Sequence, residues 1–178
     1  MKKFKGLFKF NKKKIFLLNN DSIVKIFKKN FNRYRICLHK SEKSNFQESI
    51  IFTKGYNYFR THIHPKKVSE TYIVIKGELC ICLLNKNGKI IKKILLKEKT
   101  NNSKLPFIYN LTRSEYHLVI PLMDQVIFYE ITSGRFSDKN FIKYHKSAPN
   151  EKSLLSQKID YSSKLSGINI YKKFKIEK

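Results

Sequence analysis

Short runs of apolar residues, separated by polar turns, fill most of the chain from Gln47 onward. Runs of this length, rich in Ile, Val, Tyr and Phe, are typical of β-strands. Besides a strand around His62, the pattern predicts strands over 33–39, 48–54, 70–76, 78–84, 89–96, 107–112, 116–121 and 125–132. Asn87-Gly88 lies between two of these runs and predicts a hairpin with a tight turn. Many short antiparallel strands indicate a mainly β fold, either a sandwich or a small barrel.

The two ends of the chain have a different pattern. Residues 1–19 alternate Lys with Phe, Leu and Ile, as in an arm or an edge strand. Asn20, Asp21 and Ser22 offer N-cap side chains before residues 23–31, where apolar residues recur at helical spacing. The chain is therefore expected to divide into a basic arm with a short helix over 1–32, a β-barrel domain over 33–151, and a loosely structured basic tail over 152–178.

Ile73 and Ile75 point to the opposite side of their strand from Tyr72 and Val74, so this strand is apolar on both faces. A strand of this kind needs a second sheet or a partner subunit over its outer face. The pattern therefore predicts a homodimer, formed through an outer sheet face or through a swapped N-terminal strand.

The charge of the chain is high, and it is spread along the whole length. Lys and Arg number 38 against 13 Asp and Glu, which gives a formal net charge of +25. Such a surface can bind nucleic acid or anionic membranes without sequence preference. The single alanine, Ala148, beside abundant Lys, Asn, Ile and Phe, indicates instead the codon bias of an AT-rich genome. Because the lysines form no stripe with interleaved aromatic residues, we expect no specific nucleic-acid partner.

Signals for export or membrane insertion are weak. No stretch reaches the roughly 18 consecutive apolar residues that a transmembrane segment needs. The N-terminus starts like a signal peptide, but lysines interrupt its apolar runs and no small-residue cleavage site follows. Three cysteines, Cys37, Cys80 and Cys82, are an odd count without disulfide spacing. The sequence therefore predicts a cytoplasmic protein, with the cysteines as small core residues rather than thiolate ligands.

Four residues suggest a metal centre. His62 and His64 lie two apart on a predicted strand, so both imidazoles point to the same side. Glu70 follows after a short polar turn, and His117 is expected to close the site from the opposite wall. Three imidazoles and one carboxylate can hold one divalent transition metal, Fe, Mn, Ni, Co or Zn, with positions open for water or a substrate.

Each of these residues also has an ordinary explanation. A pair of histidines two apart on a strand is common by chance, and Glu70 can be a solvated carboxylate at a strand start. The residues that follow Glu70 are apolar, however, and an unpaired buried charge among them would be costly. The combination of all four residues therefore favours the metal centre.

The spacing of these residues between Gly55 and Gly77, with His117 further along the chain, resembles the two motifs of the cupin superfamily. The resemblance can be narrowed to the WbuC family by the order of RYRICLH, FQESIIF, THIHPKKVSETYIVIKGEL, NKNGKI, PFIYNLTRSEYHLVIP, FYEITSGRF and SAPNE. It implies a cupin-type double-stranded β-helix, a jelly-roll-like small barrel. The metal ligands that it implies are His62, His64, Glu70 and His117. WbuC proteins are cupin-fold metalloproteins usually encoded in bacterial O-antigen and surface-polysaccharide gene clusters, which implies a sugar or sugar-nucleotide ligand.

Three functions stay open at this point. The first is a metal-dependent enzyme, such as an isomerase, epimerase or oxygenase, that acts on a sugar-like molecule. The second is a non-catalytic accessory or sensor cupin, and the third is a basic protein that binds nucleic acid or a membrane surface. Candidates for orienting a polar substrate are Tyr72, Arg60 and Tyr129, followed by Arg113, Tyr116 and Glu130. Strand alternation places only Tyr72 on the side of Glu70. His39 and His145 are expected to be packing or surface residues, with His39 near the barrel mouth.

Overall fold

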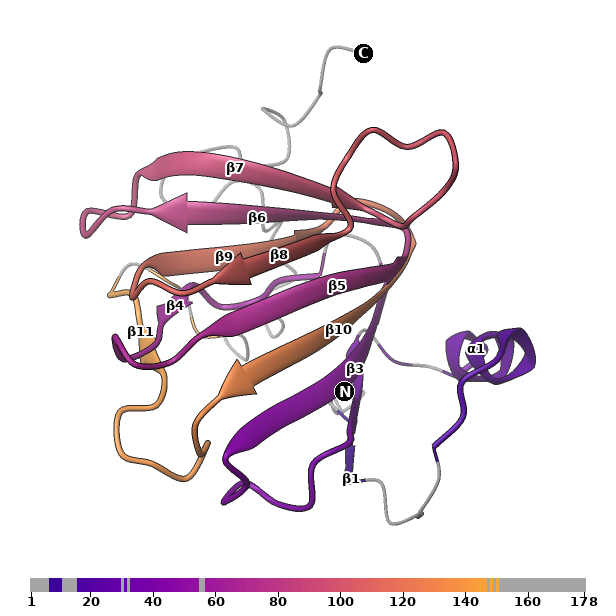
Figure 1. Ribbon diagram of the computed structural model, residues 1–178, viewed down its shortest axis with the longest axis horizontal. Helices are drawn as coiled ribbons and strands as arrows, with labels where there is room; N and C mark the ends of the chain where they lie inside the picture. The colour runs from indigo at the N-terminus through magenta and orange to yellow at the C-terminus, as the bar shows by residue number, and fades with distance from the viewer. Residues whose placement is uncertain are drawn as a thin grey trace.

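Two facing β-sheets form the body of the protein, with a short helix on the outer side of one of them (Figure 1). The computed structural model describes residues 7–10, 16–29, 31, 33–54, 57–146, 148 and 150, and only the backbone of 7–10. The predicted tail over 152–178 lies outside the described residues, and so does Gly55. No helix within the described ranges has the length and apolar character needed to cross a membrane.

The larger sheet of the described part contains, in spatial order, β1 (Leu7–Phe10), β2 (Arg33–Cys37), β3 (Phe46–Lys54), β10 (Gln125–Ser133), β5 (Glu70–Lys76) and β8 (Ile108–Leu111). The smaller sheet contains β11 (Lys143–Tyr144), β4 (His62–Ile63), β9 (Tyr116–Pro121), β6 (Glu78–Leu84) and β7 (Ile90–Lys97). Neighbouring strands are antiparallel, except that β1 runs parallel to β2. The predicted mainly β fold is confirmed.

The chain passes from the larger sheet to the smaller one at Gly77, between β5 and β6. Gly77 has a φ of +82°, which favours glycine, and a Cβ there would lie 2.8 Å from the Gln125 carbonyl oxygen. The next connection is the predicted hairpin: β6 pairs with β7, and the Gly88 amide donates to the Asn85 carbonyl at 2.9 Å. From β3 to β11, consecutive strands therefore fall in different sheets, apart from the β6–β7 hairpin, as in a jelly roll.

The main core lies between the two sheets, where alternate side chains of each strand point inward. Tyr72 and Val74 of β5 pack there against Leu79 and Ile81 of β6 and Phe128 of β10. All of them are buried, so the inner faces hold the sheets together by burying apolar surface. Toward the end of the barrel where Glu70 lies, this apolar lining gives way to polar side chains.

The helix, α1 (Asn20–Phe27), begins and ends earlier than the predicted range of 23–31. Asn19 is the N-cap residue rather than one of residues 20–22, because its side chain accepts a hydrogen bond from the Ser22 amide at 3.0 Å. Phe31 lies beyond the end of the helix but still stacks on Phe27. Both rings pack with Phe52 on the outer face of the larger sheet. The helical spacing of the apolar residues therefore extends beyond the helix itself, because Phe31 packs on the same face.

The outer face of β5 has no such cover among the described residues. The side chains of Ile75 and of Ile108, on the neighbouring β8, are 41% and 47% exposed. The helix covers β2, β3 and β10 instead, through contacts such as those of Ile26 and Phe27 with Phe52 and Ile127. The expected second layer over β5 is therefore absent from the described residues, and the homodimer stays a prediction.

Candidate metal centre

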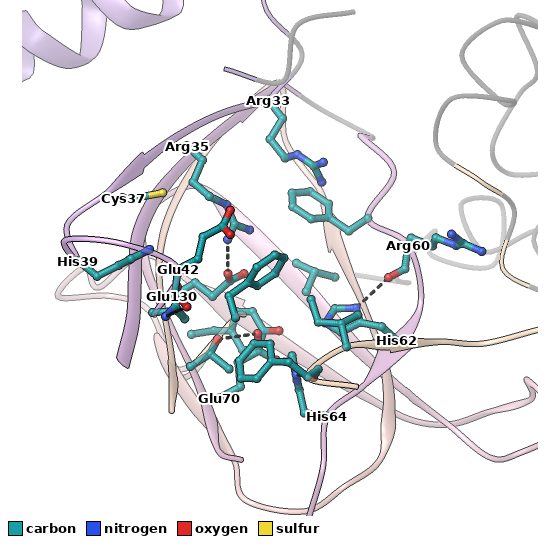
Figure 2. A pocket seen from close by; sticks show the side chains of 18 of the residues that line it. Arg33, Arg35, Cys37, His39, Glu42, Arg60, His62, His64, Glu70 and Glu130 are labelled. Carbon is teal, nitrogen blue, oxygen red and sulfur yellow. Dashed lines mark hydrogen bonds and ion pairs between the residues drawn. The ribbon is translucent and has the colours of Figure 1, made fainter. Parts of the chain in front are cut away.

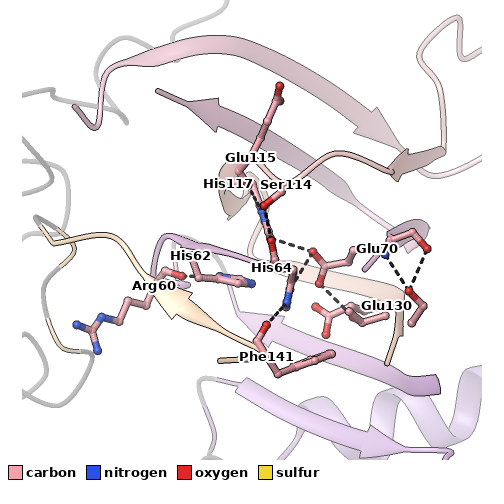
Figure 3. Close-up of polar contacts among 12 residues, drawn as sticks. Arg60, His62, His64, Glu70, Ser114, Glu115, His117, Glu130 and Phe141 are labelled. Atoms are coloured by element: carbon pink, nitrogen blue, oxygen red, sulfur yellow. Dashed lines mark hydrogen bonds and ion pairs between the residues drawn. The ribbon is translucent and has the colours of Figure 1, made fainter. Parts of the chain in front are cut away.

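Three strands bring the four predicted ligands together at one end of the barrel (Figure 3). His62 begins β4, and His64 follows directly after this two-residue strand. Glu70 is the first residue of β5, and His117 is the second residue of β9. One potential ligand atom from each of the four side chains lies within 4.8 Å of the others.

The position of His117 relative to the other three ligands differs from the predicted one. His117 does not face His62 from the opposite wall, because the two residues are direct partners in the antiparallel pair of β4 and β9. It is Glu70 that approaches from the other sheet, since β5 belongs to the larger sheet and both histidine strands to the smaller one. The cluster therefore joins the two sheets.

Each imidazole of the cluster is oriented by a backbone carbonyl. The Nδ1 atoms of His62, His64 and His117 lie 2.8, 2.7 and 3.0 Å from the carbonyl oxygens of Arg60, Phe141 and Glu115, respectively. A carbonyl oxygen can only accept, so each Nδ1 carries the proton. Each Nε2 then keeps its lone pair for a ligand, which is the usual arrangement of metal-binding histidines.

The atoms that face the centre of the cluster have no hydrogen-bond partner outside it. Nε2 of His64, Nε2 of His117 and Oε2 of Glu70 are buried, and among the described residues their polar neighbours belong to the cluster itself. The Glu70 oxygen lies 2.9 Å from Nε2 of His117 and 3.7 Å from Nε2 of His64. Buried polar atoms without partners are costly, so their convergence on one point indicates a missing ligand.

The electrostatics of the cluster are dominated by Glu70. Burial favours the neutral form of each group, and together with the neighbouring His117 it lowers the pKa of His62 to about 3. His117 behaves differently because the adjacent Glu70 carboxylate outweighs burial and raises its pKa above 6.5. In turn, His117 and His64 outweigh the effect of burial on Glu70 and hold its pKa well below 4.5. Below the raised pKa of His117, the metal-free site therefore contains a carboxylate beside a protonated imidazole.

This donor set fits a divalent transition metal. Ligand atoms bound at about 2.1 Å from one ion lie at most about 4.2 Å apart, so the cluster needs only small shifts to close on it. Three neutral imidazoles and one carboxylate suit Fe, Mn, Ni, Co or Zn. These four residues would hold the ion, and a metal that takes more than four ligands would keep positions for water or a substrate.

The cluster lies at the end of a cavity of about 500 Å³ between the two sheets (Figure 2). Its lining comes from both sheets and from the loop between β10 and β11. The lining side chains are Arg33, Arg35, Cys37, His39, Glu42, Gln47, Phe59, Arg60, His62, His64, Glu70, Tyr72, Val119, Glu130, Thr132, Phe136, Phe141, Ile142 and Tyr144. The volume is that of a small-molecule site.

Two of the three expected substrate-binding residues line this cavity. Tyr72 is fully buried, and its hydroxyl has no hydrogen-bond partner among the described residues. Arg60 also lines the cavity, and its guanidinium stacks over the Tyr144 ring at 4.1 Å. Tyr129 lies on the outer face of β10 instead, where its hydroxyl donates to Glu48 at 2.9 Å. Strand alternation turns the next residue, Glu130, inward.

The other singled-out residues lie apart from the ligand cluster. Arg113 is exposed in a loop, and Tyr116 packs edge-on against the ring of His145. His145 is buried, with Nε2 3.0 Å from the Lys86 carbonyl oxygen, so it is a packing residue. His39 lines the cavity away from the metal ligands.

The cysteines are buried and also lie outside the ligand cluster. Cys80 and Cys82 belong to an apolar cluster that does not include the residues of the main core. Their sulfur atoms are 3.7 Å apart, and both residues are free thiols, as is Cys37 in β2. No thiolate therefore joins the predicted metal ligands among the described residues.

The structure adds polar residues that the sequence pattern did not single out as a site. Arg33 and Arg35 point from β2 into the cavity, and Arg35 forms an ion pair with Glu130 at 2.9 Å. Their positions two apart on a strand were a signal that they share a face. What could not be read from the sequence is that this face of β2 is the inner one, because that depends on its pairing with β3.

Comparison with solved structures supports the fold. Protein SO0799 of Shewanella oneidensis has a TM-score of 0.52 at 9% identity, over 79% of this chain and 90% of that one. The fold is a cupin-type double-stranded β-helix. Similar structures include a double-stranded β-helix protein from Klebsiella pneumoniae (TM-score 0.48, 14% identity, 66% of this chain and 88% of that one).

The cupin domain of Cnp3 from Schizosaccharomyces pombe is also similar, with a TM-score of 0.43 and 10% identity. The match covers 58% of this chain and 65% of that domain, so this chain spans less than two thirds of its length. A family model described as a domain of unknown function (DUF6016) matches residues 27–96. A comparison with curated proteins finds no match.

Proposed function

We propose that this protein is a cytoplasmic, metal-dependent cupin of the WbuC type that binds a sugar or sugar-nucleotide intermediate of bacterial surface-polysaccharide synthesis. The observation that carries the proposal is the convergence of buried donor atoms from His64, Glu70 and His117, which have no hydrogen-bond partner outside the cluster among the described residues, at one end of a small-molecule cavity. The resemblance of the sequence to WbuC proteins supports the polysaccharide context.

The chemistry of the site follows from its donors. A bound divalent metal would polarise a carbonyl or hydroxyl oxygen of the ligand, or activate a water molecule. The chain itself supplies Tyr72, whose buried hydroxyl can donate to an oxygen of a ligand held beside Glu70. Phe59 and Phe141 line the same cavity and exclude water from it, which strengthens each of these polar interactions.

The proposed metal site is tested by the metal content of the purified protein. Wild type should hold roughly one equivalent of a divalent transition metal per chain, measured by inductively coupled plasma mass spectrometry. His62→Ala and His117→Ala should lose it, because each removes one of four ligands. His39→Ala is the matched control, since His39 lines the cavity but lies outside the ligand cluster. Unchanged metal in the two ligand variants would refute the site.

Turnover is tested separately with the metal-loaded protein. Nucleotide-sugar pools incubated with wild type are compared by chromatography with pools incubated with His117→Ala. Loss of one nucleotide sugar with wild type alone identifies an enzyme. Saturable binding of that class without turnover identifies an accessory cupin, and binding of neither kind contradicts the proposed ligand class.

We also propose that the protein forms a homodimer through the outer face of β5 and β8. This face exposes Ile75 and Ile108, and no layer of the described chain covers it. Sedimentation equilibrium at micromolar concentration tests the proposal, and Ile75→Glu should shift a dimer toward monomer. A monomeric wild type would refute it.

A further inference from the structure

Two arginines line the cavity from one strand. In β2, Tyr34 and Ile36 pack on the outer face against the helix, so the alternate residues Arg33 and Arg35 point inward. Figure 2 shows both side chains at one end of the cavity and His64 and Glu70 at the other. A ligand that meets the metal centre with one group therefore has two guanidinium groups within the same cavity for another.

Each guanidinium is held in place by a neighbour on the cavity wall. Arg35 forms its ion pair with Glu130 at 2.9 Å, and both side chains are largely buried. The Arg33 guanidinium lies over the Phe59 ring at 4.8 Å from the ring centre. The ion pair and the ring contact orient both guanidinium groups before a ligand arrives.

The charge of the lining favours an anion once the metal is present. Three arginines (Arg33, Arg35 and Arg60) and three glutamates (Glu42, Glu70 and Glu130) line the cavity. These charges cancel, so a divalent ion bound by Glu70 and neutral histidines leaves an excess of two positive charges. A partly enclosed cavity with such an excess concentrates anions.

We propose that Arg33 and Arg35 form a subsite for an oxyanion, a carboxylate or phosphate, on the ligand whose other end meets the metal centre. The planar guanidinium donates two parallel hydrogen bonds to such a group, which a neutral hydroxyl cannot match. This inference rests on the proposed function and narrows its ligand class to acidic or phosphorylated sugars. Carboxylate and phosphate share this chemistry, and the experiment separates them.

The test measures binding of three probes by isothermal titration calorimetry. These are glucose 1-phosphate, glucuronate and neutral glucose, each titrated into metal-loaded and into chelator-treated protein. Wild type should bind at least one anionic probe more tightly than glucose. Arg33→Gln should weaken that probe by roughly tenfold or more and leave glucose unchanged, because it removes a charge-assisted hydrogen bond. Arg113→Gln, a change at an exposed loop arginine, should leave all three affinities unchanged.

Arg35 needs a paired change, because removing it alone leaves Glu130 as an unpaired buried charge. The double variant Arg35→Gln with Glu130→Gln keeps the net charge and should also weaken the anionic probe. Equal affinity of wild type for glucose and both anions overturns the subsite, and so does an Arg33→Gln variant that binds like wild type. If the purified protein binds no metal but its preference for anions still depends on Arg33, the proposed metal centre is refuted and the oxyanion subsite is supported.

Discussion

Oε2 of Glu70 lies 2.9 Å from Nε2 of His117, and this contact joins the two sheets of the barrel. Both atoms are buried, and outside the ligand cluster neither has a hydrogen-bond partner among the described residues. In the metal-free protein the two groups form a carboxylate–imidazolium pair below the raised pKa of His117, since each shifts the pKa of the other toward its charged form. A metal ion bound between them has to displace the imidazolium proton.

Metal binding should therefore release a proton in a pH-dependent way. Below the raised pKa of His117 the metal-free site is protonated, so metal affinity rises with pH through this pKa and levels off above it. His62 adds no step above pH 5, because its pKa is about 3. Calorimetric metal titrations at pH 6.5, in two buffers of different ionisation enthalpy, should show a net release of protons. Binding without proton release would contradict the pair.

A second prediction concerns the effect of Glu70→Gln on the pKa of His117 in the metal-free protein. Without the carboxylate, burial is the dominant influence on His117, so its pKa should fall below 6.5. Nuclear magnetic resonance titration of the His117 ring measures this directly. Glu78→Gln is the control, because Glu78 pairs with Lys97 on the surface and should leave the His117 pKa unchanged. A His117 pKa that stays above 6.5 in Glu70→Gln would mean that another group carries the charge.

A third prediction concerns the loop that orients His64. The Phe141 carbonyl accepts a hydrogen bond from Nδ1–H of His64, and a Cβ at Gly134 would lie 3.1 Å from the Phe141 ring. Gly134 also has a φ of +99°, so Gly134→Ala should cost about 1–2 kcal/mol in the free energy of unfolding. Because Phe141 must move, metal affinity should fall as well.

Gly88→Ala is the matched control for this change. Gly88 has a φ of +80° in the hairpin turn between β6 and β7, so alanine is strained there too. Both variants should lose similar stability in urea titrations, and only Gly134→Ala should bind metal more weakly in calorimetry. Equal metal affinities in the two variants would show that the loop does not orient His64.

The features of this site that depend on neighbouring residues can be predicted from the sequence. The features that depend on how distant strands pair cannot. Strand alternation and apolar neighbours place His62 with His64 and mark Glu70 as buried, which needs no knowledge of distant contacts. The pairing of His62 with His117 is different, because the register of β4 against β9 is a long-range contact. The pairing of β10 with β3 and β5 likewise decides that Glu130 faces the cavity and Tyr129 does not.

The apolar face of helix α1 could be predicted from the sequence, but the residues at which the helix begins and ends could not. The spacing of Phe27 and Phe31 predicted an apolar face, and both rings do pack on the larger sheet. The end of the helix at Phe27 is set by the return of the chain into β2 at Arg33, which no local pattern records. The N-cap is Asn19, one residue before the predicted candidates, because several neighbouring side chains can cap equally well.

The last prediction concerns the hydroxyl of Tyr72. This group is buried in the cavity without a hydrogen-bond partner among the described residues, beside the carboxylate of Glu70. An unpaired buried hydroxyl costs free energy, so Tyr72→Phe should leave the free energy of unfolding unchanged or raise it by up to about 1 kcal/mol. Metal content should stay at the wild-type level, while affinity for the cavity ligand should fall by roughly tenfold.

Tyr129→Phe, on the outer face of the same sheet, is expected to have the opposite effects on stability and ligand affinity. Its hydroxyl donates to Glu48 at 2.9 Å, so its removal should lower the free energy of unfolding by about 1 kcal/mol. Ligand affinity should not change, because Tyr129 does not line the cavity. Urea unfolding and calorimetry on both variants separate the two roles. If Tyr72→Phe destabilises the protein as Tyr129→Phe does and binds ligand normally, the Tyr72 hydroxyl serves the fold rather than the ligand.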